Sequence, residues 1–385
     1  MKIIADENIP FVEEGFAPLG EVRVMSGRAI TRETLRDAEM LVVRSITRVD
    51  RALLDGTPVR FVGTCTIGTD HVDLDYLAKQ GIAFASAPGS NATSVAEYIV
   101  YGMLELAHRL SFRLADKTLA VIGVGNVGSR VGRRGEALGM RVLLNDPPLA
   151  RSTGDAKYRP LDEILPQADL VTLHVPLEKD GDDPTWRMVN DAFLARMKPG
   201  AMLFNSSRGG VQDERALVAA KKSGKLAALF LDVWDGEPNV NVETLAAADL
   251  ASPHICGYSA DGKVAGVMMV QRAACKLLGV ASDWDPSDKL PPPQYRGASL
   301  DHYAGHFEQM LRALVMRTYD FPGDDRRMRE ILTLPADKRA KHFDSMRKNY
   351  PCRREFRNTT LTLTGDSRKW CSALKGLGFS VSDKA

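Results

Sequence analysis

The chain has 385 residues, of which 44% are hydrophobic and 26% are charged, and its formal net charge is +2. This length exceeds that of one ordinary domain, so we expect two or three domains with separate cores. The composition is typical of a globular protein and excludes collagen-like, fibrous and largely disordered classes.

The sequence gives no indication of a membrane or secreted protein. Its most apolar helical stretch, residues 94–107, is too short to span a bilayer and contains Glu97 and Glu105. Asp6 and Glu7 interrupt the N-terminus before an apolar signal core could form. The five cysteines are scattered and form no CxxC pair. We therefore expect reduced thiols, a cytoplasmic location and no metal site.

The first 285 residues contain two runs of short apolar segments that alternate with helical patterns. Such segments are typical of parallel strands covered by helices on both faces. We predict strands at 2–5, 21–25, 40–44, 60–63, 119–123, 140–145, 169–173, 201–205 and 228–233. We predict helices at 71–80, from Asn91 to Leu110, and at 262–279.

The last part of the chain begins after a segment rich in Pro and Asp, DWDPSDKLPPPQYRG, which is typical of a linker. We expect a separate α+β unit there, with helices near 302–317 and 325–348. From Pro286 onward there are 19 Lys/Arg against 12 Asp/Glu, a net charge of +7 that leaves −5 on the preceding residues. A solvated basic surface, a site that attracts an anionic substrate and a nucleic-acid patch are the alternatives. The absence of interleaved aromatic residues disfavours nucleic acid.

A glycine-rich turn follows the predicted strand at 119–123. In LAVIGVGNVGSRV, Gly123, Gly125 and Gly128 come between an apolar strand and a helix. In this context the glycines allow a tight turn, close approach of a pyrophosphate and packing of helix on strand. The helix N-terminus then favours the anion. The sequence therefore predicts a dinucleotide site.

Asp146 ends the next predicted strand, 18 residues after Gly128. An acid at this distance binds the ribose hydroxyls and repels a 2′-phosphate, which favours NAD over NADP. The alternative is a turn residue before Pro147 and Pro148.

Three polar side chains follow predicted strands or lie in the loops just beyond them: Arg208, Glu237 and His254. An imidazole can take a proton near neutral pH, and a guanidinium can bind a carboxylate through two hydrogen bonds. A nearby Glu would orient the imidazole and favour its protonated form. Taken singly, each residue could equally be a surface Arg, a solvated Glu or a loop His.

The runs VIGVGNVG (121–128), NSSRGGVQDERALVAA (205–220), FLDVWDGEP (230–238) and SPHICGYS (252–259) resemble the D-isomer-specific 2-hydroxyacid dehydrogenase family. The resemblance implies an α/β fold with two Rossmann-like lobes built on parallel sheets. It implies a flavodoxin-like substrate lobe at 1–95 and 257–285, and an NAD-binding lobe at 96–256. Arg208, Glu237 and His254 would be the catalytic residues of this NAD-dependent enzyme.

GTCTIGTDHVD (63–73), PGSNATSVAEY (88–98) and the extra C-terminal region resemble members of this family that oxidise a phosphorylated 2-hydroxy acid. This likeness implies a homodimer, joined by a C-terminal α+β dimerisation domain at 286–385. It also implies substrate contacts at Ser45, Thr66 and Tyr258. With the glycine motif, the implied cofactor contacts are Gly123, Gly125, Asn126, Val127, Gly128, Asp146, Val175, Ser206, Ser207, Asp232 and Gly257.

Three positions depart from the pattern of the family. Val175 replaces a hydroxyl residue, so only its backbone could contact a cofactor. Arg187 stands where many members have His. The run VAGVM at 264–268 replaces an Arg-Gly-Thr. These departures affect local contacts and leave the expected reaction unchanged.

The basic stretch 338–357 suggests that Arg347, Arg353 or Arg354 attracts or binds a substrate phosphate. The remaining alternatives are another enzyme of the same family, acting for example on D-3-phosphoglycerate or D-lactate, and an NAD-sensing protein without turnover.

Overall fold

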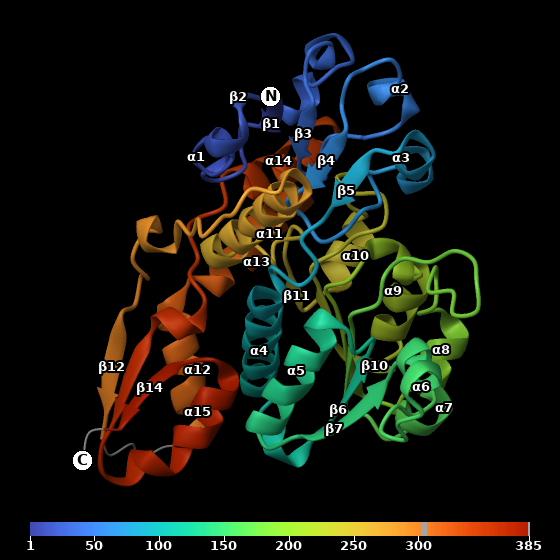
Figure 1. The fold of residues 1–385 in the computed structure, drawn as a ribbon. Helices are drawn as coiled ribbons and strands as arrows, with labels where there is room; N and C mark the ends of the chain where they lie inside the picture. Colours follow the sequence, from blue (N-terminus) through green and yellow to red (C-terminus); the bar gives the residue numbers. More distant parts are fainter. Residues whose placement is uncertain (302–305, 384–385) are drawn as a thin grey trace. The chain divides into compact units, whose positions relative to one another are not determined.

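The computed structural model describes residues 1–301 and 306–383, and the chain forms two compact units (Figure 1). Unit 1 comprises Met1–Ala92 and Ser259–Pro291, and unit 2 comprises Thr93–Tyr258 and Pro292–Ala385. Each unit contains a parallel sheet with helices on both faces, which confirms the predicted α/β class. No helix among the described residues combines the length and apolarity needed to cross a membrane.

The sheet of unit 1 has five parallel strands in the order β2-β1-β3-β4-β5. This is the flavodoxin-like order, in which the connections reverse direction between β1 and β3. Its strands are β1 (Lys2–Asp6), β2 (Glu21–Met25), β3 (Met40–Val43), β4 (Phe61–Thr64) and β5 (Ala83–Ala85). Every residue of β3 and β4 is buried, as expected for central strands covered on both sides.

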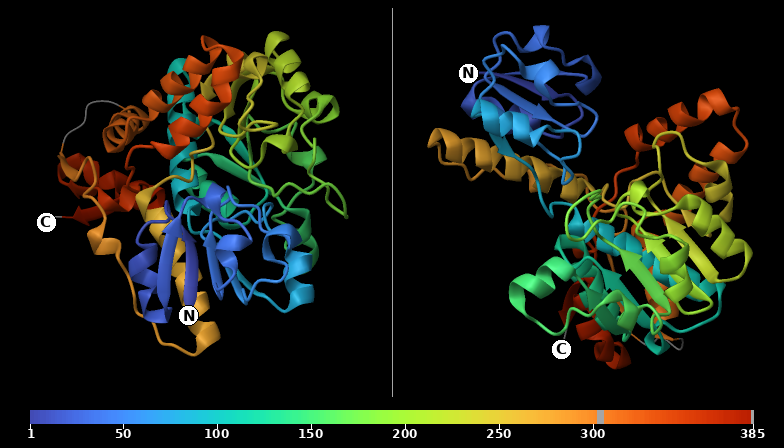
Figure 2. Two further views of the ribbon diagram at one scale, coloured as in Figure 1. Left: turned by 90° about the horizontal axis from the view of Figure 1, so that it is seen from above. Right: turned by 90° about the vertical axis from the view of Figure 1, so that its right-hand side faces the viewer.

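Alternate residues of these strands enter two separate cores. Ile3 packs with α1 (Val12–Phe16) and the long α11 (Ala260–Leu278) on one face of the sheet, and Figure 2 shows α11 running alongside it. Ile4 packs with α2 (Arg51–Leu54) and α3 (Leu74–Gln80) on the other face. The short 3-10 helices are η1 (Ala17–Leu19), η2 (Gly27–Ala29), η3 (Glu33–Leu35) and η6 (Ser287–Lys289).

The main sheet of unit 2 has six parallel strands in the order β11-β10-β9-β8-β6-β7. They are β6 (Thr118–Ile122), β7 (Arg141–Asn145), β8 (Leu170–Leu173), β9 (Ala201–Asn205), β10 (Leu226–Leu231) and β11 (Leu250–Ala251). The order reverses at β6, whose neighbours are β7 and β8. Ligands of open parallel sheets bind at the carboxyl ends of the strands beside such a reversal.

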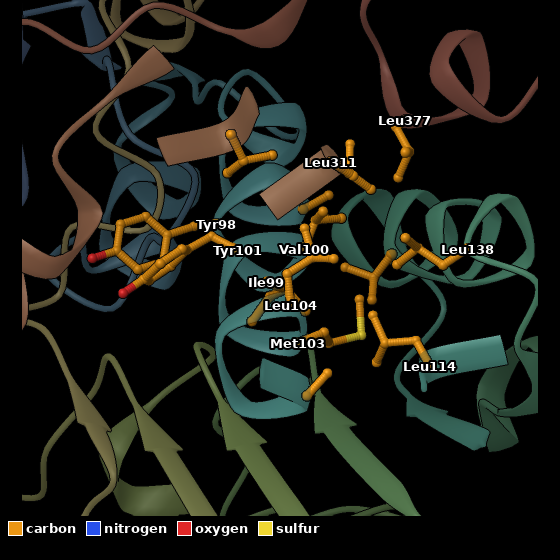
Figure 3. Packing of buried hydrophobic residues seen from close by; sticks show 14 of the residues in the cluster. Tyr98, Ile99, Val100, Tyr101, Met103, Leu104, Leu114, Leu138, Leu311 and Leu377 are labelled. Atoms are coloured by element: carbon orange, nitrogen blue, oxygen red, sulfur yellow. The ribbon is translucent and has the colours of Figure 1, made fainter. Parts of the chain in front are cut away.

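Helices of unit 2 cover both faces of this sheet. α4 (Ala92–Arg109) and α5 (Asn126–Ala137) contribute to one core, whose centre on α4 is drawn in Figure 3. The other core contains residues of α7 (Leu161–Ile164), α8 (Asp191–Arg196), α9 (Glu214–Lys222) and α10 (Val242–Ala247). The remaining elements of this part are α6 (Pro147–Thr153), η4 (Leu114–Asp116) and η5 (Gly209–Val211).

The C-terminal residues form a further three-stranded parallel sheet, with β12 (Gly297–Leu300), β13 (Thr360–Leu363) and β14 (Ser380–Asp383) in the order β12-β13-β14. The helices here are α12 (Phe307–Thr318), α13 (Phe321–Arg329), η7 (Glu330–Leu332), α14 (Ala336–Lys348), η8 (Phe356–Asn358), η9 (Gly365–Trp370) and α15 (Cys371–Leu377).

This C-terminal region shares the cores of unit 2. Leu311 lies in the buried cluster that includes α4, and Phe343 lies in the cluster on the opposite face of the main sheet. A buried hydrogen bond 2.9 Å long joins the Tyr98 hydroxyl to Asp324. Within one chain, the C-terminal region packs on the strands and helices of residues 93–258. Its division from them at residue 286, as a separate dimerisation domain, stays a prediction.

Each predicted strand occurs, with ends displaced by two residues at most. Among the described strands, β5, β11, β12, β13 and β14 were not predicted. The helix predicted at 325–348 is wrong as a single element, because α13 ends at Arg329 and α14 begins after Pro335. A proline disfavours helical geometry in the residue before it, which explains the interruption. Residues 302–305 of the helix predicted at 302–317 lie outside the described residues.

Leu311→Ala tests the shared core. Leu311 is completely buried, so truncation should lower the free energy of unfolding of unit 2 by about 2–5 kcal/mol. Chemical denaturation followed by tryptophan fluorescence measures this loss. Leu110→Ala is the control, since Leu110 is exposed and should change stability by about 0.5 kcal/mol or less. Equal effects of the two substitutions would contradict the shared core.

Candidate active site

The glycine-rich turn follows β6 at the reversal point of the main sheet of unit 2. Gly123 has φ +82°, a conformation that side chains other than glycine rarely adopt. A Cβ atom on Gly128 would lie 1.9 Å from the carbonyl oxygen of Gly123, so only glycine allows this approach of helix to turn. A Cβ on Gly125 would meet nothing within 4 Å, which leaves space beside the backbone.

Asn126 and Val127 form the first turn of α5, directly after Gly125. The N–H groups of a first helical turn have no partner within the helix and favour an anion. The turn therefore fits the pyrophosphate of a dinucleotide, as the sequence predicted.

Asp146 follows β7 and holds this turn in place. Its carboxylate accepts hydrogen bonds from the backbone N–H of Val124 at 2.8 Å and of Leu149 at 3.0 Å. The second bond caps α6. Asp146 therefore has the structural role of a residue in the turn before Pro147, which the sequence analysis gave as the alternative to ribose binding. A carboxylate has about four lone-pair sites, so these two bonds leave acceptor capacity for ribose hydroxyls.

Three further predicted cofactor residues, Val175, Ser206 and Ser207, follow β8 and β9. Val175 lies close to the turn, because a Cβ on Gly123 would be 2.9 Å from its Cγ1. The Ser206 hydroxyl is buried, and no described residue hydrogen-bonds to it. Ser207 donates to the Asn205 side-chain oxygen at 2.7 Å. A buried hydroxyl without a partner is costly, so Ser206 supports a ligand here. Gly257 lies half-buried in the loop after β11.

Asp232, at the carboxyl end of β10, is only 1% exposed. Its carboxylate accepts hydrogen bonds from the Ser252 hydroxyl at 2.6 Å and from the N–H groups of Ile255 at 2.7 Å and Cys256 at 3.0 Å. Burial raises the pKa of Asp232 above its ordinary value, although His254 and these bonds oppose the shift. The side chain thus fixes the loop that carries His254, a role that the sequence did not indicate.

Glu237 and His254 are brought together by the loops that follow β10 and β11. His254 Nδ1 lies 2.8 Å from Glu237 Oε2, and the other oxygen of Glu237 accepts the Trp234 N–H at 2.9 Å. The His254 side chain is 33% exposed and that of Glu237 is 19% exposed. His254 has φ +58°, a sparsely populated conformation for a non-glycine residue, which indicates a constraint from its surroundings.

Glu237 is held in its charged form. Burial by itself raises the pKa of this carboxyl group, but His254, the Trp234 N–H and the Arg347 charge outweigh burial and place the pKa below its ordinary value. An ionised carboxylate on Nδ1 holds the imidazole in one orientation and stabilises the imidazolium form.

Arg208 follows β9, the strand next to β10, so it lies at the same edge of the sheet as Glu237. Its guanidinium donates to the carbonyl oxygen of Ser207 at 2.9 Å. The turn after Arg208 is tight, since a Cβ on Gly209 would lie 2.0 Å from the carbonyl oxygen of Trp234. Glycine at this position allows the loops after β9 and β10 to approach each other.

The predicted substrate residues are divided between the two units. Ser45 is exposed after β3, and the Thr66 hydroxyl lies 2.8 Å from that of Thr64 at the end of β4. Both residues are therefore at the carboxyl edge of the sheet of unit 1. Tyr258 belongs to unit 2, where its ring meets that of Tyr350 edge-on, with centroids 5.7 Å apart.

The three arginines suggested for a phosphate have different surroundings. Arg353 is 2% exposed and donates to the carbonyl oxygen of Cys256, so a direct phosphate contact does not fit it. Arg354 donates to Asn358 at 2.8 Å. Arg347 lies beside Tyr258, with its guanidinium carbon 5.8 Å from the ring centroid.

The departures from the family pattern are accommodated locally. Arg187 pairs with Asp213 at 3.4 Å and with Asp235 at 3.3 Å. Within 264–268, Val264 and Val267 are buried in α11.

Within the described part of the chain, no group of three or more His, Cys, Asp or Glu side chains could hold a metal ion.

Two family models match the chain. Residues 94–256 match the NAD-binding domain of D-isomer-specific 2-hydroxyacid dehydrogenases, and residues 289–378 match a domain of unknown function. The chain is 47% identical to the erythronate-4-phosphate dehydrogenase of Salinibacter ruber, over 94% of both chains. It is 43% identical to the enzyme of that name from Cronobacter sakazakii, over 99% of both.

Among solved structures, the chain resembles D-lactate dehydrogenase from Aquifex aeolicus in complex with NAD and lactic acid. The TM-score is 0.59 at 28% identity, over 72% of this chain and 96% of that one.

Gly128→Ala tests the cofactor site. The added Cβ would collide with the Gly123 carbonyl oxygen, so α5 must move away from the turn and NAD affinity should fall at least about tenfold, since 1.4 kcal/mol suffices for that change. Titration calorimetry with NAD measures the dissociation constant. Gly132→Ala on the same helix is the control, because its Cβ would meet only atoms at 3.6 Å or beyond. Unchanged affinity in Gly128→Ala would exclude this turn as the binding site.

Proposed function

Because the chain belongs to the D-isomer-specific 2-hydroxyacid dehydrogenase family, we propose that it oxidises 4-phospho-D-erythronate to 2-oxo-3-hydroxy-4-phosphobutanoate. Identity above 40% over nearly the whole chain to two erythronate-4-phosphate dehydrogenases supports this substrate. The hydrogen bond between His254 Nδ1 and Glu237 Oε2 is the observation that carries the chemistry.

His254 is the acid–base residue of this proposal. Since Nδ1 is engaged with Glu237, Nε2 is the ring nitrogen that takes the proton of the C2 hydroxyl during oxidation and returns it in the reverse direction. The imidazolium formed in this step is stabilised by the Glu237 carboxylate, whose pKa lies below its ordinary value. NAD, when bound, supplies the acceptor for the C2 hydride.

Arg208 binds the substrate carboxylate and polarises the C2 oxygen in this proposal. Its planar guanidinium can hold two oxygens at once, and the loop after β9 places it at the edge of the sheet that also carries Glu237. Ser45, Thr66 and Tyr258 contact the rest of the substrate. Gly123, Gly125, Asn126, Val127, Gly128, Asp146, Val175, Ser206, Ser207, Asp232 and Gly257 contact NAD.

We further propose that the enzyme is a cytoplasmic homodimer, assembled through residues 286–385, and that it serves pyridoxal phosphate synthesis. The resemblance of the C-terminal region to that of family members with a dimerisation domain supports this assembly. Analytical ultracentrifugation tests it, with twice the chain mass of 42.2 kDa expected and a monomer at working concentration contradicting it.

An assay of the purified protein tests the substrate and the acid–base residue together. NAD reduction should be fastest with 4-phospho-D-erythronate and slower with D-3-phosphoglycerate or D-lactate, measured as kcat/KM. His254→Ala should lower kcat by about 10²–10⁴-fold, because the proton acceptor is lost. A preference for D-lactate would contradict the substrate, and an active His254→Ala would contradict the mechanism. Absence of turnover with every acid would favour an NAD-sensing protein.

Glu237→Gln separates the role of the carboxylate from that of the imidazole. The amide keeps the shape of the side chain but no longer stabilises the imidazolium, so the acid limb of the kcat/KM profile for oxidation should move to lower pH. The direction follows because oxidation needs the neutral imidazole, and protonation becomes harder without the carboxylate. A profile identical to that of the wild type would refute this role of Glu237.

A further inference from the structure

Three side chains at the carboxyl edge of the sheet of unit 1, those of His71, Thr64 and Thr66, form a hydrogen-bond relay. The hydroxyl of Thr64, at the end of β4, lies 3.0 Å from Nε2 of His71 and 2.8 Å from the hydroxyl of Thr66. The Thr66 hydroxyl in turn donates to the carbonyl oxygen of Gly68 at 3.3 Å. Thr64 is completely buried, whereas Thr66 and His71 are half-buried. The relay therefore connects a buried hydroxyl to one that is partly open to solvent.

The direction of each bond in the relay follows from the hydrogens available. A hydroxyl group has one hydrogen to donate, while its oxygen can also accept. The carbonyl oxygen of Gly68 can only accept, so the Thr66 hydrogen points to it. The bond between the two threonines must then use the hydrogen of Thr64. Because that hydrogen is committed, Thr64 can only accept from His71, and Nε2 of the imidazole must carry a hydrogen.

The backbone of His71 is fixed by bonds outside the relay. Its carbonyl oxygen accepts the Val49 N–H at 2.8 Å, and the carbonyl oxygen of Val49 accepts the Asp73 N–H at 2.8 Å. The Asp73 side chain caps α3 by accepting the Tyr76 N–H at 2.9 Å. The start of this helix and the loop after β3 thus hold the segment that carries the imidazole.

We propose that His71 is a positioning residue that, through Thr64, directs the Thr66 hydroxyl to donate a hydrogen bond to an oxygen of the bound acid. This proposal rests on the proposed function, in which Thr66 contacts the substrate. The bond from Thr66 to Gly68 is the longest of the three and exceeds the usual range for a hydroxyl donor and an oxygen acceptor. The Thr66 hydrogen can therefore pass from Gly68 to a substrate oxygen without reversal of any other bond in the relay.

The direction of the relay also determines which ligand atoms it favours. Since the Thr66 oxygen already accepts from Thr64, its remaining bond is a donation, which suits carboxylate and phosphate oxygens. A neutral imidazole protonated at Nε2 and a charged imidazolium both donate from Nε2, so either form of His71 supports this direction. Only a ring protonated at Nδ1 alone would reverse it, and the Gly68 carbonyl oxygen would then lose its donor.

The protonation of the His71 ring tests the relay without substrate or turnover. ¹⁵N NMR of protein with labelled histidine distinguishes protonated from unprotonated ring nitrogens, and the His71 resonances are identified by their loss in His71→Gln. We expect Nε2 to carry a hydrogen, in the neutral or in the charged ring. A ring protonated at Nδ1 alone would overturn the proposal, because Thr64 would then have to donate to Nε2.

Thr64→Val tests the effect of the relay on the substrate. Valine keeps the shape of threonine but cannot donate, so the Thr66 hydroxyl is no longer directed. KM for 4-phospho-D-erythronate should rise about 2–10-fold, the range that corresponds to one net hydrogen bond, while kcat changes by less than about twofold. His71→Leu should have the same effect. His71→Gln should restore KM, because its amide N–H can donate to Thr64.

Thr57→Val is the matched control. The Thr57 hydroxyl donates to the carbonyl oxygen of Leu54 at 2.7 Å, in the segment that precedes β4, and its removal should leave KM unchanged. A double variant then separates positioning from a general loss of packing. If Thr64 acts through Thr66, Thr64→Val should add little to the KM of Thr66→Val, since the directed hydroxyl is already absent.

The kinetic outcomes that would overturn the proposal are distinct from failure of the proposed function. An unchanged KM in Thr64→Val would overturn it, and so would full multiplication of the effects of Thr64→Val and Thr66→Val. A KM in His71→Gln as high as that in His71→Leu would also overturn it, because donation from this position would then be irrelevant. A wild-type protein inactive toward every acid would instead refute the proposed function, and the NMR result would still decide whether the relay exists.

Discussion

At the end of β10, the buried carboxylate of Asp232 accepts hydrogen bonds from the Ser252 hydroxyl and from the N–H groups of Ile255 and Cys256. A buried carboxylate without such partners would be very unfavourable, so these bonds and the loop conformation require each other. The loop holds His254 at a positive φ angle and directs its ring to Glu237, which comes from the same end of β10. One strand end thus positions both members of the proposed acid–base pair.

The C-terminal region extends this constraint. Its buried Arg353 holds the carbonyl edge of the same loop, and Arg347 lies beside Tyr258. These contacts come from the same chain, so the region contributes to the candidate site before any oligomer forms. Shared hydrophobic cores explain why the arginines are fixed, since α12 and α14 are buried against opposite faces of the main sheet of unit 2.

The parallel strands and the glycine-rich turn could be predicted because their signals are local. Apolar runs mark buried strands, and Gly123 and Gly128 stand where only glycine allows the close approach of backbone. β5 was missed because Ala83–Ala85 is three residues long and contains no β-branched side chain. Pro335 was a local signal for the break before α14. The helical pattern on both sides of this proline nevertheless led to the prediction of one continuous helix at 325–348.

Contacts between distant segments could not be read from the sequence. The stretch 338–357 is strongly basic, and such a stretch is usually solvated, yet Arg353 is buried among aromatic rings that come from α4 and from the segment around α13. The sequence likewise assigned Asp232 to the cofactor alone, and only the fold shows that its carboxylate oxygens also bind the loop of His254. Arg208, Glu237 and His254 were found because each follows a strand, whereas their chemical roles rested on family resemblance.

In the proposed oxidation the C2 hydrogen leaves as hydride while His254 takes the hydroxyl proton, and isotopic labelling distinguishes these two transfers. 4-Phospho-D-erythronate carrying deuterium at C2 is oxidised in ordinary water, and the products are examined by mass spectrometry. We expect one deuterium in the reduced cofactor, together with a primary isotope effect on the hydride-transfer step in single-turnover measurements. Deuterium released into water would mean that C2 loses a proton, and would contradict hydride transfer to NAD.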